Sequence, residues 1–417
     1  MKSYSQALKI LKKSKLIFSD ENIKISNCLN RVSAENIYSN NNYPSADNSA
    51  FDGYTINSID TKKLSIKRGK YFKIIGVISA GLKPKNKKIK KFETFEIMTG
   101  GILPKGFDTI IPKENVILYP NKRKPKYIFI NKKIIKNKNI RIKGSDYKKN
   151  DLLIKKGTII TPNHILAFKT LGIKYVKVKK IPKILFFSTG NEISNKEEIP
   201  YWKVRNSSSH YIQSIDKNFL FNFHYGGTLK DKDELVLEKQ INRLFNSKID
   251  IIITLGAVSA GKFDYIPNII KKFKLLGYFK NVAIRPGKPI LFAKFKAKQK
   301  AFFGLPGNPI SSVACFRFFV YRYLQDSLEV KIEKPIKAYL KKNYTKNINF
   351  TRFLRSNLNT TKNGKLEVEI LKDQESFRVQ PFVKSNIWTA LPAGKSEFKK
   401  GQIVDCFLPN HSNKILF

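Results

Sequence analysis

The chain has 417 residues, of which 41% are hydrophobic, and it carries a formal net charge of +49. This length allows two to four domains with proper cores, and no run of residues approaches the roughly 18 apolar positions of a membrane helix. Cys28, Cys315 and Cys406 lie far apart and histidines number four, which argues against a disulfide framework and a zinc site. The first residues lack the apolar core of a signal peptide, so we expect a cytoplasmic protein without a membrane partner.

The large positive charge first suggests a nucleic-acid binder. However, the lysines are spread over nearly every segment, from Lys62 through Lys156 to Lys346, and do not form one stripe. Asn, Ile, Phe and Tyr are frequent too, which is the joint bias expected from AT-rich codons. We therefore interpret most of the charge as a solvated surface that attracts anionic substrates, with no specific nucleic-acid partner. A non-catalytic scaffold or nucleic-acid binder remains an alternative.

Taken in chain order, the apolar pattern begins with helical spacing over residues 3–16, which predicts an amphipathic helix. Short apolar runs punctuated by Gly and Pro then predict a small β-rich domain with strands over 71–78, 92–98, 109–111 and 127–130. The pattern next predicts a strand over 151–154 and a helix over 162–171 that ends at a glycine.

From residue 183 the sequence alternates between strand and helix patterns. Strands are predicted over 183–187, 222–226, 250–254, 290–295 and 301–303. Helices are predicted over 207–221, 231–245, 266–276 and 310–324. Nearly all-apolar strands in this alternation are typical of a parallel sheet covered on both faces. Short strands return at 350–354, 366–371, 387–391 and 402–408, and they predict a small β-barrel or sandwich.

Three short loops, at 188–192, 256–261 and 304–309, each follow a β-branched or aromatic run and precede a helix pattern. In an open α/β sheet such loops meet at the carboxyl edge, where ligands bind. Backbone N–H groups at helix starts favour anions, so the first expectation is a phosphate-bearing substrate. Arg285 and Lys288 flank a rigid Pro-Gly turn and suit contact with the same oxyanions.

Seven segments in fixed order carry a family resemblance. They are residues 47–54, 97–100, 141–146, 188–192, 258–265, 286–289 and 305–309. Each segment is weak evidence alone, but the match that the seven define extends over essentially the whole chain. The series resembles the molybdopterin molybdenumtransferases, the family that inserts molybdenum into the pterin cofactor and is related to the C-terminal domain of gephyrin.

The resemblance implies roles for individual residues. The implied catalytic set is Asp52, Thr99, Asp146, Glu192, Arg285 and Lys288. The implied substrate-binding set is Ser188, Thr189, Gly190, Gly256, Ser259, Gly261, Pro306, Gly307, Asn308, Arg141, Arg355 and Ser376. The implied Mg²⁺ ligands are Glu192, Asp231 and Asp264.

Simpler interpretations of some of these residues stay open. Asp52 also suits an Asx-turn that caps a strand, and Asp231 also suits a helix cap. Arg141 and Asp146 also suit a surface ion pair of little energetic weight.

Several positions depart from the family pattern. Asn191 stands where the family usually has Asp, Lys262 where it has an acidic residue, and Glu375 where it has Gly. Ala257 replaces a second glycine and adds a methyl group at a cost of about 1 kcal/mol if the loop needs a positive φ. A lost carboxylate at position 191 would weaken metal binding. Because the other implied site residues remain, we expect an active enzyme.

The expected fold is a multidomain α/β protein. A three-layer α/β molybdopterin-binding domain covers 1–18 and 183–328, an elongated linking domain 19–45 and 147–182, a β-rich domain 46–146, and a C-terminal β-barrel 329–417. The resemblance implies a homodimer whose active site joins the α/β domain of one subunit to the β-rich domain of the other.

The expected activity is Mg²⁺-dependent transfer of molybdenum from molybdate to adenylylated molybdopterin, with release of AMP. The alternative within the same pathway is molybdopterin adenylylation, and the enzyme that performs that step is a candidate partner. The sequence leaves open molybdenum versus tungsten preference, affinities and accessory partners.

Overall fold

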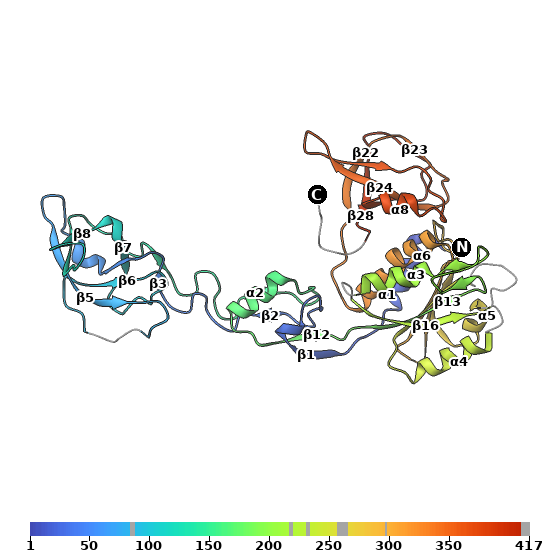
Figure 1. Cartoon of the computed structure of the whole chain (residues 1–417), viewed down its shortest axis with the longest axis horizontal. Coiled ribbons are helices and arrows are strands. Elements are labelled where there is room, and N and C mark those ends of the chain that lie inside the picture. Colours follow the sequence, from blue (N-terminus) through green and yellow to red (C-terminus); the bar gives the residue numbers. More distant parts are fainter. Residues whose placement is uncertain (84–87, 217–219, 231–233, 257–265, 297, 410–417) are drawn as a thin grey trace. The chain divides into compact units, whose positions relative to one another are not determined.

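The computed structural model describes residues 1–417 apart from 84–87, 217–219, 231–233, 257–265, 297 and 410–417. The chain divides into two compact units, whose parts can be followed by colour in Figure 1. The first unit comprises Met1–Glu35, Lys156–Thr161 and Lys177–Phe417, and the second comprises Asn36–Lys155 and Pro162–Val176. The finer division into four domains stays a prediction.

A six-stranded sheet in the order β16-β13-β17-β21-β20-β18 forms the centre of the first unit. Its strands are β13 (Lys183–Thr189), β16 (Asn222–Leu229), β17 (Ile251–Leu255), β18 (Leu275–Lys280), β20 (Leu291–Phe295) and β21 (Ala301–Leu305). β16, β13, β17 and β21 are parallel, whereas β20 is antiparallel to both of its neighbours. Every residue of β17, β20 and β21 is buried, which confirms a sheet covered on both faces.

Helices pack on both faces of this sheet (Figure 1). They are α1 (Tyr4–Lys13), α3 (Ser207–Asp216), α4 (Glu234–Phe245), α5 (Ile266–Lys271), α6 (Pro309–Cys315) and α7 (Tyr321–Ser327), with a π-helical turn over Phe316–Val320 joining the last two. Ile251 and Ile253 share a core cluster with residues of α1, α3, α6 and α7, whereas Ile252 clusters with residues of α4 and α5. Successive strand residues point to opposite faces, so this alternation accounts for the all-apolar sequence of β17.

Two predicted helix ends were wrong. The helix expected over 266–276 is the shorter α5, and Leu275–Lys280 instead forms β18, an edge strand paired antiparallel with β20. The helix expected over 207–221 is observed as α3, and residues 220 and 221 are not helical. In both places the apolar residues serve tertiary packing, since Phe221 and Phe279 are buried in the same cluster.

The C-terminal part of the first unit is a closed five-stranded barrel. Its strands are β22 (Ile336–Leu340), β24 (Thr351–Thr360), β25 (Leu366–Ile370), β26 (Ile387–Leu391) and β28 (Ile403–Phe407), and the pairing of β24 with β26 closes the ring. The short elements β19 (Ile284–Arg285), β23 (Tyr344–Thr345), β27 (Glu397–Phe398) and α8 (Gln380–Lys384) accompany it. The expected C-terminal barrel is therefore confirmed.

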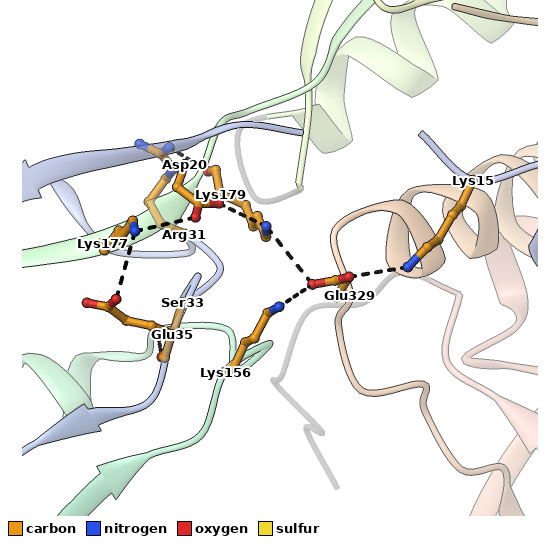
Figure 2. A network of polar contacts seen from close by, with 9 residues as sticks. All are labelled: Lys15, Asp20, Arg31, Ser33, Glu35, Lys156, Lys177, Lys179 and Glu329. Carbon is orange, nitrogen blue, oxygen red and sulfur yellow. Dashed lines mark hydrogen bonds and ion pairs between the residues drawn. The ribbon is translucent and has the colours of Figure 1, made fainter. Parts of the chain in front are cut away.

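Charged side chains of the first unit gather around Glu329, which follows α7 (Figure 2). Its carboxylate lies 2.8 Å from Lys156 Nζ, 3.2 Å from Lys15 Nζ and 4.0 Å from Lys179 Nζ. The hydrogen bond from Lys156, aided by Lys15, lowers the pKa of Glu329 to about 2. These contacts tie the end of α1 and the strand β12 (Tyr175–Lys179) to the end of α7.

The second unit is rich in β-structure, as predicted. Its main sheet has the order β7-β4-β6-β5-β9-β8. The strands are β4 (Gly53–Ile56), β5 (Lys70–Ile78), β6 (Glu93–Ile97), β7 (Thr109–Pro112), β8 (Ile117–Tyr119) and β9 (Tyr127–Ile130).

Shorter elements complete the described chain. They are β1 (Asp20–Lys24), β2 (Ile37–Tyr38), β3 (Asn48–Ser49), β10 (Ile140–Arg141), β11 (Leu152–Ile154), α2 (Pro162–Thr170), β14 (Ile193–Ser194) and β15 (Val204–Arg205). Short 3₁₀ turns cover Ile25–Asn27, Ser58–Thr61 and Lys113–Asn115. Among the described residues, no helix combines the length and the apolar character needed to cross a bilayer.

Candidate active site

A cleft of about 1100 Å³ opens in the first unit where β13, β17 and β21 end. Thr189 is the last residue of β13, Leu255 the last of β17 and Leu305 the last of β21, and all three strand ends reach the cleft or the loop beside it. The described residues of the three predicted loops, with Gly256 alone from the second, therefore meet at the carboxyl edge of the sheet. The cleft lining from the sequence-derived set comprises Thr189, Gly190, Glu192, Gly256, Arg285, Lys288, Pro306, Gly307, Asn308 and Ser376.

Glycine is required at Gly256 for two reasons. Its φ of +92° lies in a region that other residues rarely adopt, and a Cβ atom there would stand 2.6 Å from Thr189 Oγ1. The Gly256 N–H donates to the Leu305 carbonyl at 2.8 Å, while Thr189 Oγ1 donates to the Leu255 carbonyl at 2.5 Å. These bonds join the ends of β13, β17 and β21, and the missing side chain lets Thr189 pack directly against the Gly256 backbone.

Two exposed cations, Arg285 and Lys288, flank the Pro286-Gly287 turn on one wall of the cleft. The Arg285 guanidinium lies over the Phe350 ring, 4.6 Å from its centroid, which orients the cation without neutralising it. Neither cation forms an ion pair within 4 Å with any residue in the described part of the chain. Their charge is therefore available to an anionic ligand.

The barrel contributes a second wall through the 373–378 loop, which contains Ser376. Asn308 Nδ2 donates to Ser376 Oγ at 2.9 Å, and the N–H of Ile310 donates to the Ser376 carbonyl at 3.2 Å. The start of α6 and the barrel loop therefore meet at the cleft. The Ser376 hydroxyl and the Asn308 amide therefore lie together in the cleft that the two cations also line.

Two residues expected to contact substrate are buried beside the cleft and do not line it. Ser188 is fully buried and donates to Asn206 Oδ1 at 2.9 Å, which helps to hold the loop after β13. Arg355 is 1% exposed, and its guanidinium donates to Gln374 Oε1 and to three backbone carbonyls of the 373–378 loop. Both side chains therefore hold loops that line the cleft.

In the second unit, Asp52 and Thr99 form one polar pair. The Thr99 N–H and Oγ1 both donate to Asp52 Oδ1 at 2.8 Å, and Lys113 Nζ lies 3.8 Å from the other carboxylate oxygen. The Thr99 N–H bond, with smaller effects from its hydroxyl and from Lys113, lowers the pKa of Asp52. The carboxylate is thus kept ionised at the protein surface, and Asp52 and Thr99, which the sequence analysis placed in separate motifs, lie together.

Arg141 and Asp146 line a separate hollow of about 610 Å³ in the second unit, together with Asn48 and Lys169. Arg141 pairs in register with Asn48 across β10 and β3. Ser49, the other residue of β3, accepts the Gly100 N–H beside Thr99. Strand β3 therefore connects the Arg141 hollow to the Asp52–Thr99 pair. No ion pair between Arg141 and Asp146 within 4 Å is found among the described residues.

Comparison with known proteins decides the family. A model of the MoeA N-terminal region (domain I and II) matches residues 2–172, a probable molybdopterin binding domain matches 186–326, and the MoeA C-terminal region (domain IV) matches 337–408. A Staphylococcus aureus molybdopterin molybdenumtransferase is 33% identical over 93% of this chain and 90% of its own length. The chain belongs to the MoeA family. The family expected from the sequence is therefore confirmed.

Further MoeA relatives agree along the full length. A molybdopterin molybdenumtransferase of Staphylococcus epidermidis is 31% identical over 97% of this chain and 95% of its own. A crystal structure of the molybdopterin biosynthesis moeA protein from Pyrococcus horikoshii OT3 superposes with a TM-score of 0.82 at 25% identity, covering 98% of this chain and all of that one. The MoeA fold is thus shared across all parts of the chain.

The expected metal site lies partly outside the described residues. Glu192 lines the cleft, whereas Asp231 and Asp264 fall within 231–233 and 257–265, as do the expected substrate contacts Ser259 and Gly261. The departures Ala257 and Lys262 from the MoeA pattern fall there as well. Within the described part of the chain, no three His, Cys, Asp or Glu side chains gather as a metal site would require.

Sequence reasoning missed several residues that line the cleft of this MoeA chain. Arg352, Gln374 and Phe377 come from the barrel, and Ser311 comes from α6. Arg352 lies in a strand that was predicted over 350–354. The strand was therefore expected, but the face to which the Arg352 side chain points was not. In the structure Thr351 is buried and Arg352 is partly exposed, a difference that the sequence did not show.

Proposed function

We propose that this chain transfers molybdenum from molybdate to adenylylated molybdopterin and releases AMP. Relatives that share about a third of its residues over almost all of its length bear the name molybdopterin molybdenumtransferase. The observation that supports the proposal is the cleft at the carboxyl edge of the sheet, which Arg285 and Lys288 line together with Gly190, Gly256 and Gly307. Cations and amides held in fixed positions are what anionic phosphate and molybdate groups require.

In this proposal Arg285, Lys288 and the loop amides bind the phosphate and molybdate oxygens. Gly190 and Gly256 line the cleft at positions where a Cβ atom would clash with Glu192 and Thr189. Ser376 from the barrel loop and Asn308 from the start of α6 orient the bound anions. None of these groups is placed as a covalent nucleophile, so the protein acts by positioning the reactants and by stabilising negative charge.

Magnesium is the proposed cofactor. Mg²⁺ takes oxygen ligands and shares them with substrate phosphates, and the Glu192 carboxylate meets this requirement because it lines the cleft and forms no ion pair within the described residues. Asp231 and Asp264 are the further proposed ligands. When bound, the ion would neutralise phosphate charge during cleavage of the adenylate.

The test is AMP release from adenylylated molybdopterin supplied with molybdate and Mg²⁺. We expect the wild-type chain to release AMP and Lys288→Ala to lose most of this activity. Lys342→Ala removes a highly exposed lysine of the C-terminal barrel and serves as the matched control. Absence of AMP release by the wild type would defeat the proposal, and turnover of ATP with free molybdopterin would instead favour adenylylation.

We further propose a cytoplasmic homodimer in which Asp52 and Thr99 of one subunit complete the cleft of the other. A heterodimer with Asp52→Asn in one subunit and Lys288→Ala in its partner would then retain one intact site and about half of the activity. If each site used one chain alone, this heterodimer would be inactive. Association with the adenylylating enzyme remains a proposal that pull-down with purified proteins tests.

A further inference from the structure

One face of the main sheet in the second unit carries four exposed or half-buried aromatic rings. Tyr71 of β5 pairs in register with Phe129 of β9, and Tyr119 of β8 pairs with Tyr127 of β9. Cross-strand partners lie on the same side of a sheet, as do residues two apart on one strand, so the four rings share one side. We call this side the aromatic face. Tyr71 is 51% exposed and Tyr119 is 52% exposed, so both rings are open to solvent.

The opposite face of the same strands builds the core of this unit. Phe72, Ile128 and Ile130 alternate along the strands with the four aromatic residues, and they are buried in one hydrophobic cluster. Successive strand residues point to opposite faces, so burial of this set turns the other set outward. A structural role in the core therefore does not explain the rings of the aromatic face.

The four rings hold each other in place. The Tyr71 centroid lies 5.4 Å from that of Tyr119 and 5.1 Å from that of Phe129. Tyr127 meets Tyr71 edge to face at 6.4 Å. The Phe129 ring also lies against Gly69, where a Cβ atom would stand 2.1 Å from Phe129 Cζ. Side chains that are already ordered lose little further entropy when a ligand binds, so this surface is preorganised.

Cations without acidic partners border the aromatic face. Residues 121–138 contain eight Lys or Arg and no Asp or Glu. Four of these cations lie in the turn between β8 and β9, which Asn121 Oδ1 orders by accepting two backbone N–H groups. Lys73 is exposed and pairs in register with Tyr127, so it lies on the aromatic face itself. None of these nine cations forms an ion pair within 4 Å with a residue that the structure describes.

One carboxylate lies at the border of this surface. Glu93 of β6 pairs in register with Lys73, but its Oε2 atom accepts the Lys90 N–H at 2.8 Å and lies more than 4 Å from the Lys73 ammonium. The aromatic face therefore combines planar apolar rings with uncompensated positive charge. A second copy of the chain would bring like charge to it, so the charge favours an anionic partner.

We propose that the aromatic face binds single-stranded nucleic acid without sequence preference, in addition to the activity proposed above. Every base presents a π-face that stacks on an exposed aromatic ring, and cations along the same surface neutralise the phosphates. Neighbouring strands lie about 4.8 Å apart, so the rings of β5, β9 and β8 follow each other closely enough for successive bases of one strand. An acidic polypeptide would pair with the cations but would offer the rings no planar partners. A solvated surface, which accounts for the charge of the chain as a whole, does not place four rings together.

The test is fluorescence anisotropy on the full chain with a labelled oligothymidylate of about 15 nucleotides at about 0.1 M salt. We expect the double variant Tyr71→Ala/Tyr119→Ala to bind about 30-fold more weakly, the loss of two stacked bases at the lower limit of their usual contribution. Its salt dependence should be unchanged because no charge is removed. Lys73→Gln should instead reduce the slope of log K against log salt by about 0.7.

Two controls separate stacking from damage to the fold. Tyr175→Ala removes a tyrosine of the same exposure, 52%, outside the aromatic face and should bind like the wild type. Tyr71→Leu/Tyr119→Leu keeps apolar side chains on the sheet but no π-faces, so it should lose about as much affinity as the alanine variant. Circular dichroism verifies that each variant is folded. AMP release should be unchanged in both tyrosine variants, since neither residue lines the cleft.

An oligonucleotide of equal length that lacks bases separates stacking from charge, and we expect it to bind more than about tenfold more weakly. The proposal is overturned if this abasic strand binds as well as oligothymidylate, or if both tyrosine variants stay within about twofold of the wild type. Absence of wild-type binding at about 0.1 mM protein would overturn it too. Equal competition by polyglutamate of the same charge would assign the face to acidic polypeptides instead.

Discussion

Replacing Arg355 tests whether this buried arginine contacts the ligand or positions the loop that does. Arg355 is 1% exposed and its guanidinium donates four hydrogen bonds of 3.1–3.2 Å. Burial, with a smaller contribution from Arg352, lowers the pKa of Arg355 to about 10, so the group stays protonated at neutral pH. Arg355→Met keeps much of the side-chain volume and removes all four bonds.

The expected cost follows from these bonds. A hydrogen bond from a charged group contributes about 1.5–3 kcal/mol, but the carbonyls of the exposed 373–378 loop regain water once released. At the lower limit of this range the four bonds together contribute about 6 kcal/mol. We expect half of that sum, about 3 kcal/mol, to be lost from the local stability of the loop. That loss corresponds to a roughly hundredfold larger opening equilibrium.

Hydrogen–deuterium exchange of the peptide that contains Ser376 measures this change directly. We expect exchange in Arg355→Met to rise by about two orders of magnitude, with a weaker affinity for substrate as a consequence. Arg355→Lys keeps the charge but lacks the planar fork, so most of the exchange increase should persist. Unchanged exchange together with lost affinity would refute the positioning role and show that Arg355 touches the ligand itself.

Three further predictions follow from single contacts. The pKa of Glu329 is lowered to about 2, so the stability that its carboxylate contributes is present above pH 4.5 and lost as the pH falls towards 2. Because the side chain is 37% exposed, we expect this contribution to be only about 1 kcal/mol. Glu329→Gln should flatten this part of the acid-unfolding curve, and an unchanged curve would contradict the assignment. Thr99→Val should raise the pKa of Asp52 and shift the acidic limb of the activity profile to higher pH, whereas an identical limb would count against it. Gly256→Ala should weaken substrate binding more than tenfold, through about 1–2 kcal/mol of backbone strain plus a clash. Gly364→Ala, where φ is also positive but the space is open, should leave binding intact; equal effects on binding would show that no clash operates.

Much of the architecture could be predicted because local patterns carry it. The apolar run of β17 predicts a strand buried on both faces, and Ile251 and Ile252 indeed enter different core clusters. The loops at Gly190, Gly256 and Gly307 were expected at one sheet edge because parallel strands end there together. The edge strand β18 was missed because its apolar residues also suit a helix, and pairing with β20 decided between them.

Apart from the edge strand β18, the sequence by itself determined the order of the main strands and helices, the loops after the parallel strands and the family, since each depends on residues that are neighbours in the chain. Only the tertiary structure decided which arginine of β24 faces the cleft. Arg352 and Arg355 are separated by three positions, so they point to opposite faces of the strand. The pairing of β24 with β26 places Arg355 on the face of Trp388, where it donates to the 373–378 loop, and the pairing of β24 with β19 places Arg352 beside Arg285.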